Sequence, residues 1–469
     1  MLEEVVPVNR SNRPTVSPTG QDDAVPSMRR VAWLVFAVVA VASIARGTGP
    51  ILYDADAYWS ETLSLLTSRE YPSSVEGYYG MRGVLTVTTF APAAFVTKVA
   101  GVTFAQSAVL LQNALLLGWI AGFLVPRVIA PWRQLGLEAR WVVGLLCWLL
   151  LGGFAPYALV DLYAAAALTV AIVCMRSMRP GTLLGAGLLV AYAVNVRPAY
   201  VPVAVLLGVL VLVVQRWRAV LVAVGVGVGL APQAIYNALH YGTISPFPVE
   251  SRGLVGLQAG YASYVVRYDT MPWRGTDPQQ FYCSPDMASV IKTPPNSATE
   301  LFATYFAYLP DSAVFTLTKV GAALHWPLSL PYTSVNPGFD PIFAVTTTLV
   351  VVAGTAFLLA CRPRCAGPFP WAHRYFAAAV VAASVATLAG TATETRFAIP
   401  LVLWGIVGVA GIVESGPATL RQHRVIVSVT LAVSALLVFL GVLGLAHPAP
   451  PGGVDVETCA ARTVHSDQS

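Results

Sequence analysis

Charged residues are scarce in this sequence. They make up only 11% of its 469 residues, whereas soluble domains carry about 25%. Hydrophobic residues reach 56%, and the mean hydropathy is +0.67. So few polar side chains cannot cover a soluble body of this size. We therefore expect lipid to be the solvent of most of the chain, which excludes an ordinary soluble enzyme.

Lysine and cysteine are also rare. Lys98, Lys292 and Lys319 are the only lysines, so most of the +5 formal charge comes from an excess of arginine. No basic run with interleaved aromatic residues is present, so no nucleic-acid partner is expected. The six cysteines fit neither a zinc site nor a disulfide framework. A bond between Cys283 and Cys459 is permitted if both lie outside the cell, and the sequence leaves that pairing open.

What the chain does contain is a series of apolar runs that approach the length of a membrane span. Before the first of them, we expect residues 1–30 to form a disordered cytoplasmic tail rather than a cleavable signal peptide. The eleven expected spans lie at about 31–46, 104–125, 141–156, 158–175, 181–196, 198–214, 219–236, 342–360, 375–391, 397–414 and 424–446.

The arginines in the short loops predict the orientation of these spans. With the N-terminal tail inside, every second loop is basic, as expected for cytoplasmic loops. This holds only if the segments 83–100 and 302–325 do not cross, and their polar residues and prolines suit helices lying in the membrane interface. A count of thirteen spans would include both segments and would place several arginine-rich loops outside.

We therefore expect an all-α, multi-pass protein of the inner membrane with two large outer loops that carry juxtamembrane helices. The expected order is an N-terminal transmembrane module at 31–236 with an outer loop at 47–103, an outer cap loop at 237–341, C-terminal transmembrane helices at 342–446 and an outer tail at 447–469. The cap loop is too rich in aromatic residues to be a disordered tether, so we expect a folded lid.

An acidic and aromatic cluster follows the first apolar run. Asp54 and Asp56 lie among Tyr53, Tyr58 and Trp59, whose rings suit the headgroup zone of a membrane. Polar residues crowd many membrane exits, so this cluster alone does not identify a site. Its combination with motifs further along the chain favours a catalytic carboxylate in the first outer loop.

Those motifs resemble one superfamily, the GT-C integral membrane glycosyltransferases that use polyprenyl-phosphate sugars as donors. The resemblance rests on short motifs in a shared order: Tyr53-Asp54-Ala55-Asp56-Ala57-Tyr58, Val75-Glu76-Gly77-Tyr78, Arg82-Gly83, Asn195-Val196-Arg197-Pro198, Pro232-Gln233-Ala234-Ile235-Tyr236-Asn237 and Glu394-Thr395-Arg396. It implies a GT-C-like fold, seven core helices before the large second outer loop and an active site on the outer face.

Sugar transfer to a hydroxyl requires a base that accepts the proton of the acceptor and cations that stabilise the departing phosphate. Asp54 and Asp56 are the candidate bases, and on an extended segment their spacing would direct both side chains the same way. Burial would raise the pKa of such a base toward the working pH. The family pattern favours Asp54, although Asp56 stays open. The two carboxylates could also hold a divalent cation, but they specify no metal, and no other cofactor is expected.

Arginine binds phosphate in a bidentate manner and keeps its charge, so Arg197, Arg396 and Arg82 are the candidate ligands of the donor phosphate. Structural pairing or snorkelling is the alternative for each, and Asp161 is a candidate buried partner of an arginine. Gln233, Asn237 and His240 would share one helix face. Candidate substrate contacts are Tyr58, Glu61, Glu76, Gln233, Asn237, His240 and Glu394.

The expected function is transfer of a sugar from a polyprenyl phosphate to a cell-envelope glycan or glycolipid. The composition indicates a high-GC genome, which would make arabinose or mannose on an actinobacterial-type lipid the expected donor. The main alternative is a transporter or lipid-linked sugar flippase, although no internal repeat of the kind common in transporters is visible. A membrane scaffold would leave the carboxylates and arginines unexplained, and a polymerase or ligase of lipid-linked glycans would carry its functional loop later in the chain.

Overall fold

The structure is a computed structural model that describes residues 24–68, 82–249, 256, 258–270, 279–291, 295–325, 331–333, 341–364, 371–391, 393–422 and 424–449. Helix α1 (Ala24–Ile44) begins before the first apolar run. The prediction of a disordered tail is therefore wrong for residues 24–30, where the helix starts, while residues 1–23 lie outside the described part.

A helix occupies each of the segments that the sequence predicts to span. Within the described residues, seven segments are long and apolar enough to cross a membrane, which indicates a polytopic, predominantly helical membrane protein. One of them, Pro198–Tyr241, contains two helices separated by a turn in which Arg216 has φ +51°, so the count of eleven spans stays a prediction. The helices that occupy the predicted spans are, besides α1, α6 (Ala105–Trp119) with its continuation through a π-helix (Ile120–Leu124) and α7 (Val125–Ile129), α8 (Leu137–Leu151), α9 (Asp161–Met175), α10 (Pro180–Val196), α11 (Val201–Gln215), α12 (Ala219–Tyr241), α17 (Pro341–Ala360), α18 (Ala372–Gly390), α19 (Ile399–Gln422) and α20 (Arg424–Gly444).

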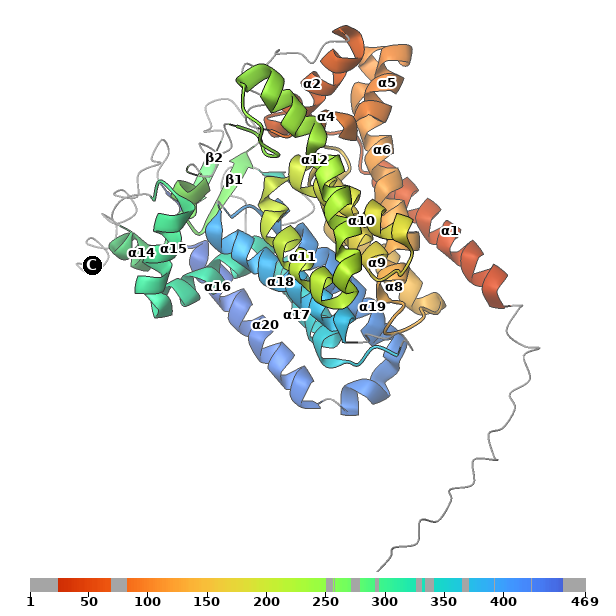
Figure 1. The fold of residues 1–469 in the computed structure, drawn as a ribbon. Coiled ribbons are helices and arrows are strands. Elements are labelled where there is room, and N and C mark those ends of the chain that lie inside the picture. The colour runs from red at the N-terminus through yellow and green to blue at the C-terminus, as the bar shows by residue number, and fades with distance from the viewer. Residues whose placement is uncertain are drawn as a thin grey trace, which may run out of the picture.

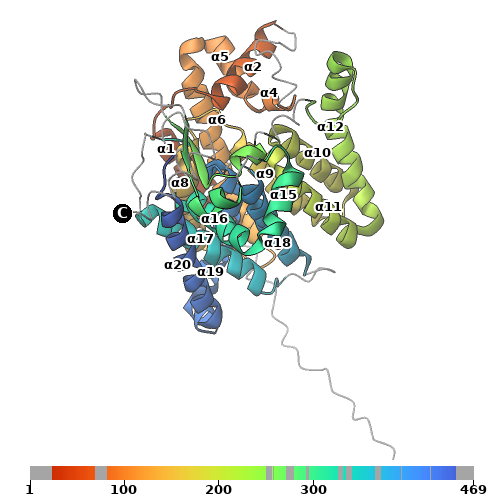
Figure 2. The same cartoon turned by 90° about the vertical axis from the view of Figure 1, so that its left-hand side faces the viewer.

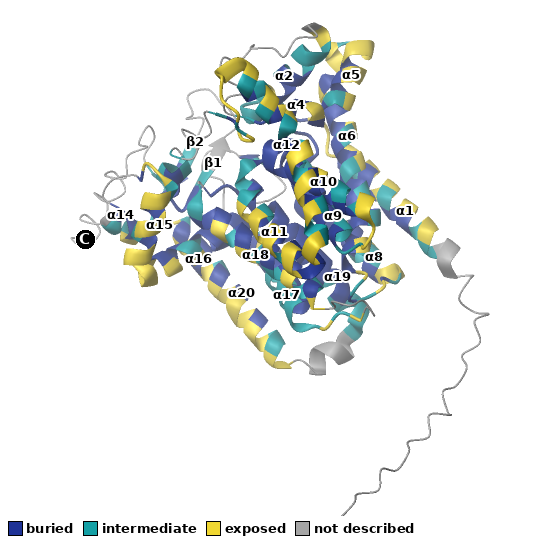
Figure 3. Cartoon of the chain, in the orientation of Figure 1, coloured by how far each residue is buried: buried dark blue, intermediate teal, exposed yellow. Residues whose placement is uncertain are grey.

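The outer faces of these helices are apolar. Figure 3 shows the centre of the bundle buried, while α20 and α12 present exposed residues along their length. On α20 the exposed side chains include Val425, Val429 and Phe439. Large apolar side chains on the surface of a helical bundle are expected where the solvent is lipid.

Close helix contacts inside the bundle depend on small residues. At the crossing of α17 and α19, a Cβ added to Gly354 would lie 2.0 Å from the carbonyl oxygen of Gly405. No side chain fits in that space, so the two backbones pack directly against each other, as is common between helices in membranes.

The first loop contains helices of its own. They are α2 (Asp54–Ser68), α4 (Thr86–Thr89) and α5 (Ala91–Ala100), and both views place them together at one end of the bundle (Figures 1 and 2). We call this the Asp54 end, and the opposite one, where Arg133 lies, the Arg133 end. At about 1.5 Å per residue, α5 is too short to cross a membrane, in agreement with the prediction for 83–100.

The second large loop forms a cap, defined here as the described residues between 258 and 333. It holds α14 (Pro285–Val290), α15 (Ala298–Ala307) and α16 (Leu309–His325). It also holds a three-stranded sheet of order β2-β1-β3, made of β1 (Val266–Thr270), β2 (Gln279–Tyr282) and β3 (Tyr332–Thr333). The sheet departs from the all-α expectation, whereas the predicted folded lid is present. Helix α16 is not among the candidate spans.

Two sets of contacts attach the cap to the bundle. Lys319 is fully buried in α16, and its ammonium donates to the carbonyls of Ala262 (2.8 Å), Ala389 (3.3 Å) and Thr391 (3.0 Å). These bonds join α16, the start of the cap and the end of α18. The hydroxyl of Tyr305 also donates to the carbonyl of Ala389 (3.0 Å). Lys319 is one of the polar residues for which the segment 302–325 was predicted not to cross the membrane. In the structure it fixes the cap to the bundle.

The chain after α20 runs beside β2. The amide of Cys283 donates to the carbonyl of His447 and the amide of Ala449 to that of Phe281, each over 2.8 Å. Cys283 is disulfide-bonded, and its partner lies outside the described residues, as does Cys459. The segment after the last span therefore meets the cap, as expected if both lie on one side of the membrane.

Candidate functional site

The site is built around the start of α2. Tyr53 adopts φ +52° and Asp54 is the first helical residue, where a carboxylate is favoured by the helix dipole. Because α2 is a helix, residues two apart point about 200° apart. The expectation that Asp54 and Asp56 point the same way, based on an extended segment, is therefore wrong. Asp56 is exposed and accepts a hydrogen bond from Ser60 (3.3 Å).

The carboxylate of Asp54 is held between two arginines. Arg82 Nη2 donates to Oδ1 over 2.8 Å, and Arg396 Nη2 lies 2.9 Å from Oδ2. Burial by itself would raise the pKa of Asp54. The surrounding positive charges, first Arg82 and then Arg396, outweigh it and hold the pKa well below its ordinary value, with Arg197 and Arg267 contributing at longer range. The expectation of a raised pKa is thus wrong for this unliganded geometry.

Arg396 also pairs with Glu394, so one guanidinium bridges two carboxylates. Its Nε donates to Glu394 Oε2, and Arg267 Nη2 of strand β1 lies 3.6 Å from Glu394 Oε1. Burial would raise the pKa of Glu394, but Arg396 and then Arg267 lower it overall. Arg267 belongs to no recognised motif and was missed in the sequence. Its backbone amide donates to the carbonyl of Thr393 (2.8 Å), which ties the cap to this side of the site.

Arg197 lies at the same end but is paired differently. Its Nε is 2.7 Å from Oδ1 of Asp161, both side chains are nearly fully buried, and the guanidinium stacks 4.7 Å from the Phe397 ring. The prediction of Asp161 as a buried partner of an arginine is confirmed. Among the described residues, Arg197 Nη2 and the hydroxyl of Tyr58 are buried donors without a hydrogen-bond acceptor.

The described part of this cluster contains four guanidiniums, those of Arg82, Arg197, Arg267 and Arg396, and three carboxylates, those of Asp54, Asp161 and Glu394. Arginine binds phosphate oxygens in a bidentate manner and keeps its charge. A partly buried cluster rich in guanidiniums, with a buried Arg197 donor that has no acceptor among the described residues, favours the binding of an anion.

The amides predicted to contact the sugar are engaged within the protein. Gln233 Oε1 accepts from the amide of Val84 (2.9 Å), and its Nε2 donates to Asn237 Oδ1 (3.0 Å). Asn195 Oδ1 accepts from the amide of Leu85 (2.9 Å). A Cβ on Gly83 would lie 2.1 Å from the carbonyl oxygen of Asn195. This buried network fixes the turn that carries Arg82, so the geometry favours a structural role for Gln233 and Asn237.

Three further predicted contacts lie apart from the ion pairs or outside the described part. His240 is exposed and stacks on Tyr236 with ring centroids 4.3 Å apart. Glu61 is fully buried, so it is enclosed by protein. Glu76 lies outside the described residues. In the described part of the chain, no group of three or more His, Cys, Asp or Glu side chains could hold a metal ion, and both Asp54 oxygens are paired with arginine.

The cap closes over the start of α2 through Tyr332 of β3, another residue that the sequence did not single out. Its hydroxyl donates to the carbonyl of Leu52 (2.9 Å), two residues before Asp54. Its ring contacts those of Tyr53 and Tyr157, with centroids 5.7 and 5.0 Å away. The only signal in the sequence was the general aromatic content of the loop.

Comparison with models of known protein families, with curated proteins and with solved structures found no match. The candidate site therefore has to be interpreted from its own geometry and chemistry.

Proposed function

We propose that this chain is a membrane glycosyltransferase that moves a sugar, arabinose or mannose, from a polyprenyl-phosphate donor to a glycan or glycolipid acceptor of the cell envelope, with its site on the outer face. One observation supports this above all others. The carboxylate of Asp54 is held between two guanidiniums, in a cluster of four arginines, where the first loop meets the ends of membrane helices. An amphiphilic donor with a phosphate headgroup presents its anion at this depth.

The reaction assigned to the site is a single displacement. The acceptor hydroxyl oxygen attacks the anomeric carbon, the bond between that carbon and the phosphate oxygen breaks, and the hydroxyl proton passes to Asp54. The donor phosphodiester carries one negative charge and the departing lipid monophosphate carries a second. Arg82 and Arg396 therefore stabilise the transition state more strongly than the ground state, as catalysis requires.

Asp54 is a weak base while two arginines hold it. We infer an arginine exchange, in which the donor phosphate competes with Asp54 for Arg82 and Arg396 and takes over part of their hydrogen bonding. The pKa of Asp54 then rises toward its ordinary value, and burial under the cap raises it further. The carboxylate becomes competent to accept a proton only when donor is present. Asp56 is exposed on the other side of α2, so the geometry favours Asp54 as the base.

The experiment compares Asp54→Asn with Asp56→Asn in purified protein. The readout is transfer of radiolabelled sugar from synthetic polyprenyl-phosphate arabinose or mannose to membrane acceptors. Loss of a general base costs about 10²- to 10⁴-fold in rate, so Asp54→Asn should lose nearly all turnover. Asp56→Asn, a matched change on the same helix, should stay within a few-fold of wild type. Full activity in both variants would dismiss the base assignment.

Donor binding by Asp54→Asn tests the arginine exchange separately. Asparagine no longer neutralises Arg82 and Arg396, so donor should bind at least as tightly as to wild type, and inactivity would reflect the chemical step. Weaker donor binding would contradict the exchange while leaving the base assignment intact. Movement of intact lipid across vesicles without sugar transfer would favour the flippase instead.

A further inference from the structure

A polar cavity lies at the Arg133 end of the bundle. It has a volume of 550 Å³ and is lined by residues 130–134 between α7 and α8, by Arg364 after α17, and by Glu414 and Ser415 of α19. Arg396 lies three residues before helix α19 begins at Ile399, and Glu414 of that helix, which lines this cavity, comes 18 residues after Arg396. At about 1.5 Å per residue, the two sites lie roughly a membrane thickness apart. The positive-inside pattern assigns this end to the cytoplasm.

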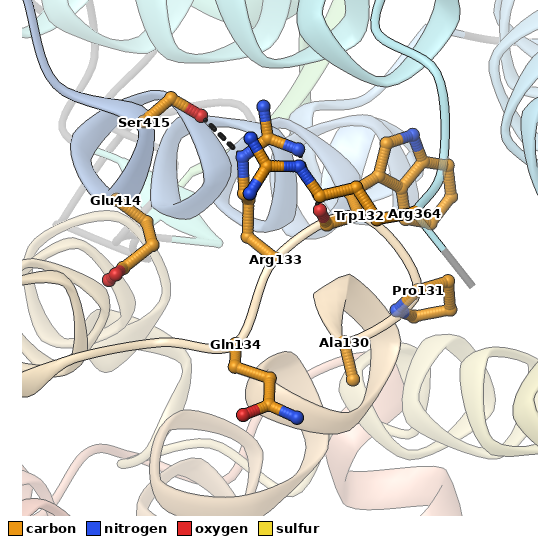
Figure 4. Close-up of a pocket in the computed structure, with 8 residues that line it drawn as sticks. All are labelled: Ala130, Pro131, Trp132, Arg133, Gln134, Arg364, Glu414 and Ser415. Atoms are coloured by element: carbon orange, nitrogen blue, oxygen red, sulfur yellow. Dashed lines mark hydrogen bonds between the residues drawn. The ribbon is translucent and has the colours of Figure 1, made fainter. Parts of the chain in front are cut away.

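Two arginines line this cavity. Figure 4 shows the guanidiniums of Arg133 and Arg364 side by side next to the Trp132 indole, while the carboxylate of Glu414 points away from them. The carboxylate accepts a hydrogen bond from the amide of Gly136 (2.6 Å). Among the described residues, neither arginine forms an ion pair with a carboxylate.

The backbone holds the two arginines in this arrangement. The amide of Arg364 donates to the carbonyl of Pro131 (2.8 Å), so the chain after α17 is fixed to the opposite wall of the cavity. Arg133 Nε donates to Ser415 Oγ (2.9 Å) and its Nη1 to the carbonyl of Trp132 (2.8 Å). These bonds leave Nη2 of Arg133 and the guanidinium of Arg364 to bind a ligand.

The environment of Arg133 is unfavourable for its positive charge. Burial, and next the nearby charge of Arg364, lower the pKa of the Arg133 guanidinium from its ordinary value. A shared anion would remove this repulsion, since two arginines can chelate the oxygens of a single phosphate. A neutral ligand would leave it in place.

We propose that this cavity is a binding site for a phosphate group, held between Arg133 and Arg364, with Ser415 beside it. The position of the cavity at the ends of membrane helices matches the depth of a phospholipid headgroup. Basic pockets between membrane helices on the cytoplasmic side bind anionic lipid headgroups. A soluble phosphate compound would present the same group, so the experiment has one arm for each source. This inference does not depend on the proposed sugar transfer.

The test uses purified full-length protein in wild-type, Arg364→Gln and Arg362→Gln forms. The exposed side chain of Arg364 forms no hydrogen bond or ion pair with the described residues, so its loss should leave the fold intact. Arg362 is an exposed control with the same charge change two residues away. One arm measures retention of phosphatidylglycerol over phosphatidylcholine by native mass spectrometry from mixed micelles. The other titrates inorganic phosphate and follows the thermal unfolding midpoint.

We expect Arg364→Gln to reduce phosphatidylglycerol retention about tenfold or more, since each charge-assisted bond to phosphate contributes on that scale, and Arg362→Gln to match wild type. Stabilisation by inorganic phosphate that disappears in Arg364→Gln, without lipid selectivity, would support the same site with a soluble ligand. Equal retention and equal stabilisation in all three proteins would overturn the proposal. So would an identical loss in Arg362→Gln, which would indicate nonspecific surface charge.

Discussion

Arginine side chains have different bonding partners at the two ends of the helix bundle. At the Asp54 end, Arg82 and Arg396 are paired with carboxylates in a partly buried cluster. At the Arg133 end, Arg133 donates to a hydroxyl and a carbonyl, and the neighbouring Arg364 has no carboxylate partner in the part of the chain that the structure describes. An anion at the first end has to displace a carboxylate, whereas an anion at the second end meets guanidiniums that are already unpaired.

This difference teaches how the same residue can serve two purposes. A paired arginine ties ligand binding to a change in its former partner, which suits a site where a base must be released at the right moment. An arginine without a carboxylate partner is destabilised by neighbouring positive charge until an anion binds to it. Binding of the anion then changes no other ionic group, which suits a permanently bound structural ligand.

The variant Arg396→Gln should give the largest effect at the Asp54 end. In the proposed reaction this change removes a contact to the departing phosphate, and it leaves Glu394 with one fewer partner, so sugar transfer should fall about 100-fold or more. Arg396→Lys should restore little, because a lysine cannot bridge two carboxylates or bind phosphate in a bidentate manner. Sugar transfer by the exposed control Arg362→Gln should equal wild type. An active Arg396→Lys would show that charge alone suffices.

Breaking the Asp161–Arg197 pair should affect stability more than any single change at the Arg133 end. Asp161→Asn leaves a buried guanidinium without its counter-charge, which costs about 3–5 kcal/mol. The double variant Asp161→Leu, Arg197→Met should recover much of that stability while remaining inactive. Thermal unfolding in detergent measures both effects. An unaltered midpoint in Asp161→Asn would mean that the pair is solvated in the membrane.

The variant Lys319→Met should loosen the cap at the Asp54 end and leave the Arg133 end unchanged. It removes the donor shared by the carbonyls of Ala262, Ala389 and Thr391, and unsatisfied buried groups cost about 1–3 kcal/mol. Hydrogen–deuterium exchange should accelerate in the cap around 258–263 and stay unchanged in loop residues near Arg133. Equal exchange in variant and wild type would remove Lys319 as the anchor of the cap.

The smallest expected effect is the pH dependence of folding. The pKa values of Asp54 and Glu394 are lowered in the folded protein. Their contribution is therefore complete above the ordinary carboxyl pKa of about 4 and is lost as pH falls through the lowered folded values. The unfolding midpoint of wild type should decline below about pH 4, and that of Asp54→Asn should decline less steeply. Parallel curves of unfolding midpoint against pH for the two proteins would contradict the ion pairing of the Asp54 carboxylate.

Much of this arrangement was predictable from local patterns. Apolar runs located the helices, and the motifs around Asp54, Arg82, Arg197 and Arg396 named groups that the fold does bring together. Periodicity also placed Gln233 and Asn237 on one helix face, where they bond to each other. Their assignment to sugar binding was less secure, since a pattern shows which side chains are neighbours but not whether their bonds are already used.

The remainder depends on contacts between distant segments. The orientation of Asp56 was mispredicted because a helix begins at Asp54, and only the geometry of Tyr53 sets that start. Arg267 comes from a strand that pairs with two other strands of the cap and is hydrogen-bonded to Thr393, more than 120 residues away in the sequence. The lowered pKa of Asp54 sums charges from four separate segments, which no local pattern contains.

The pairing of residues 447–449 with β2 has a consequence for biogenesis. Residues 447–449 follow helix α20 and are synthesised long after strand β2, so β2 gains these hydrogen bonds only once α20 and the segment beyond it have been made. A polypeptide truncated before residue 447 would leave the amide of Cys283 and the carbonyl of Phe281 without these partners, so we expect its cap to be less stable.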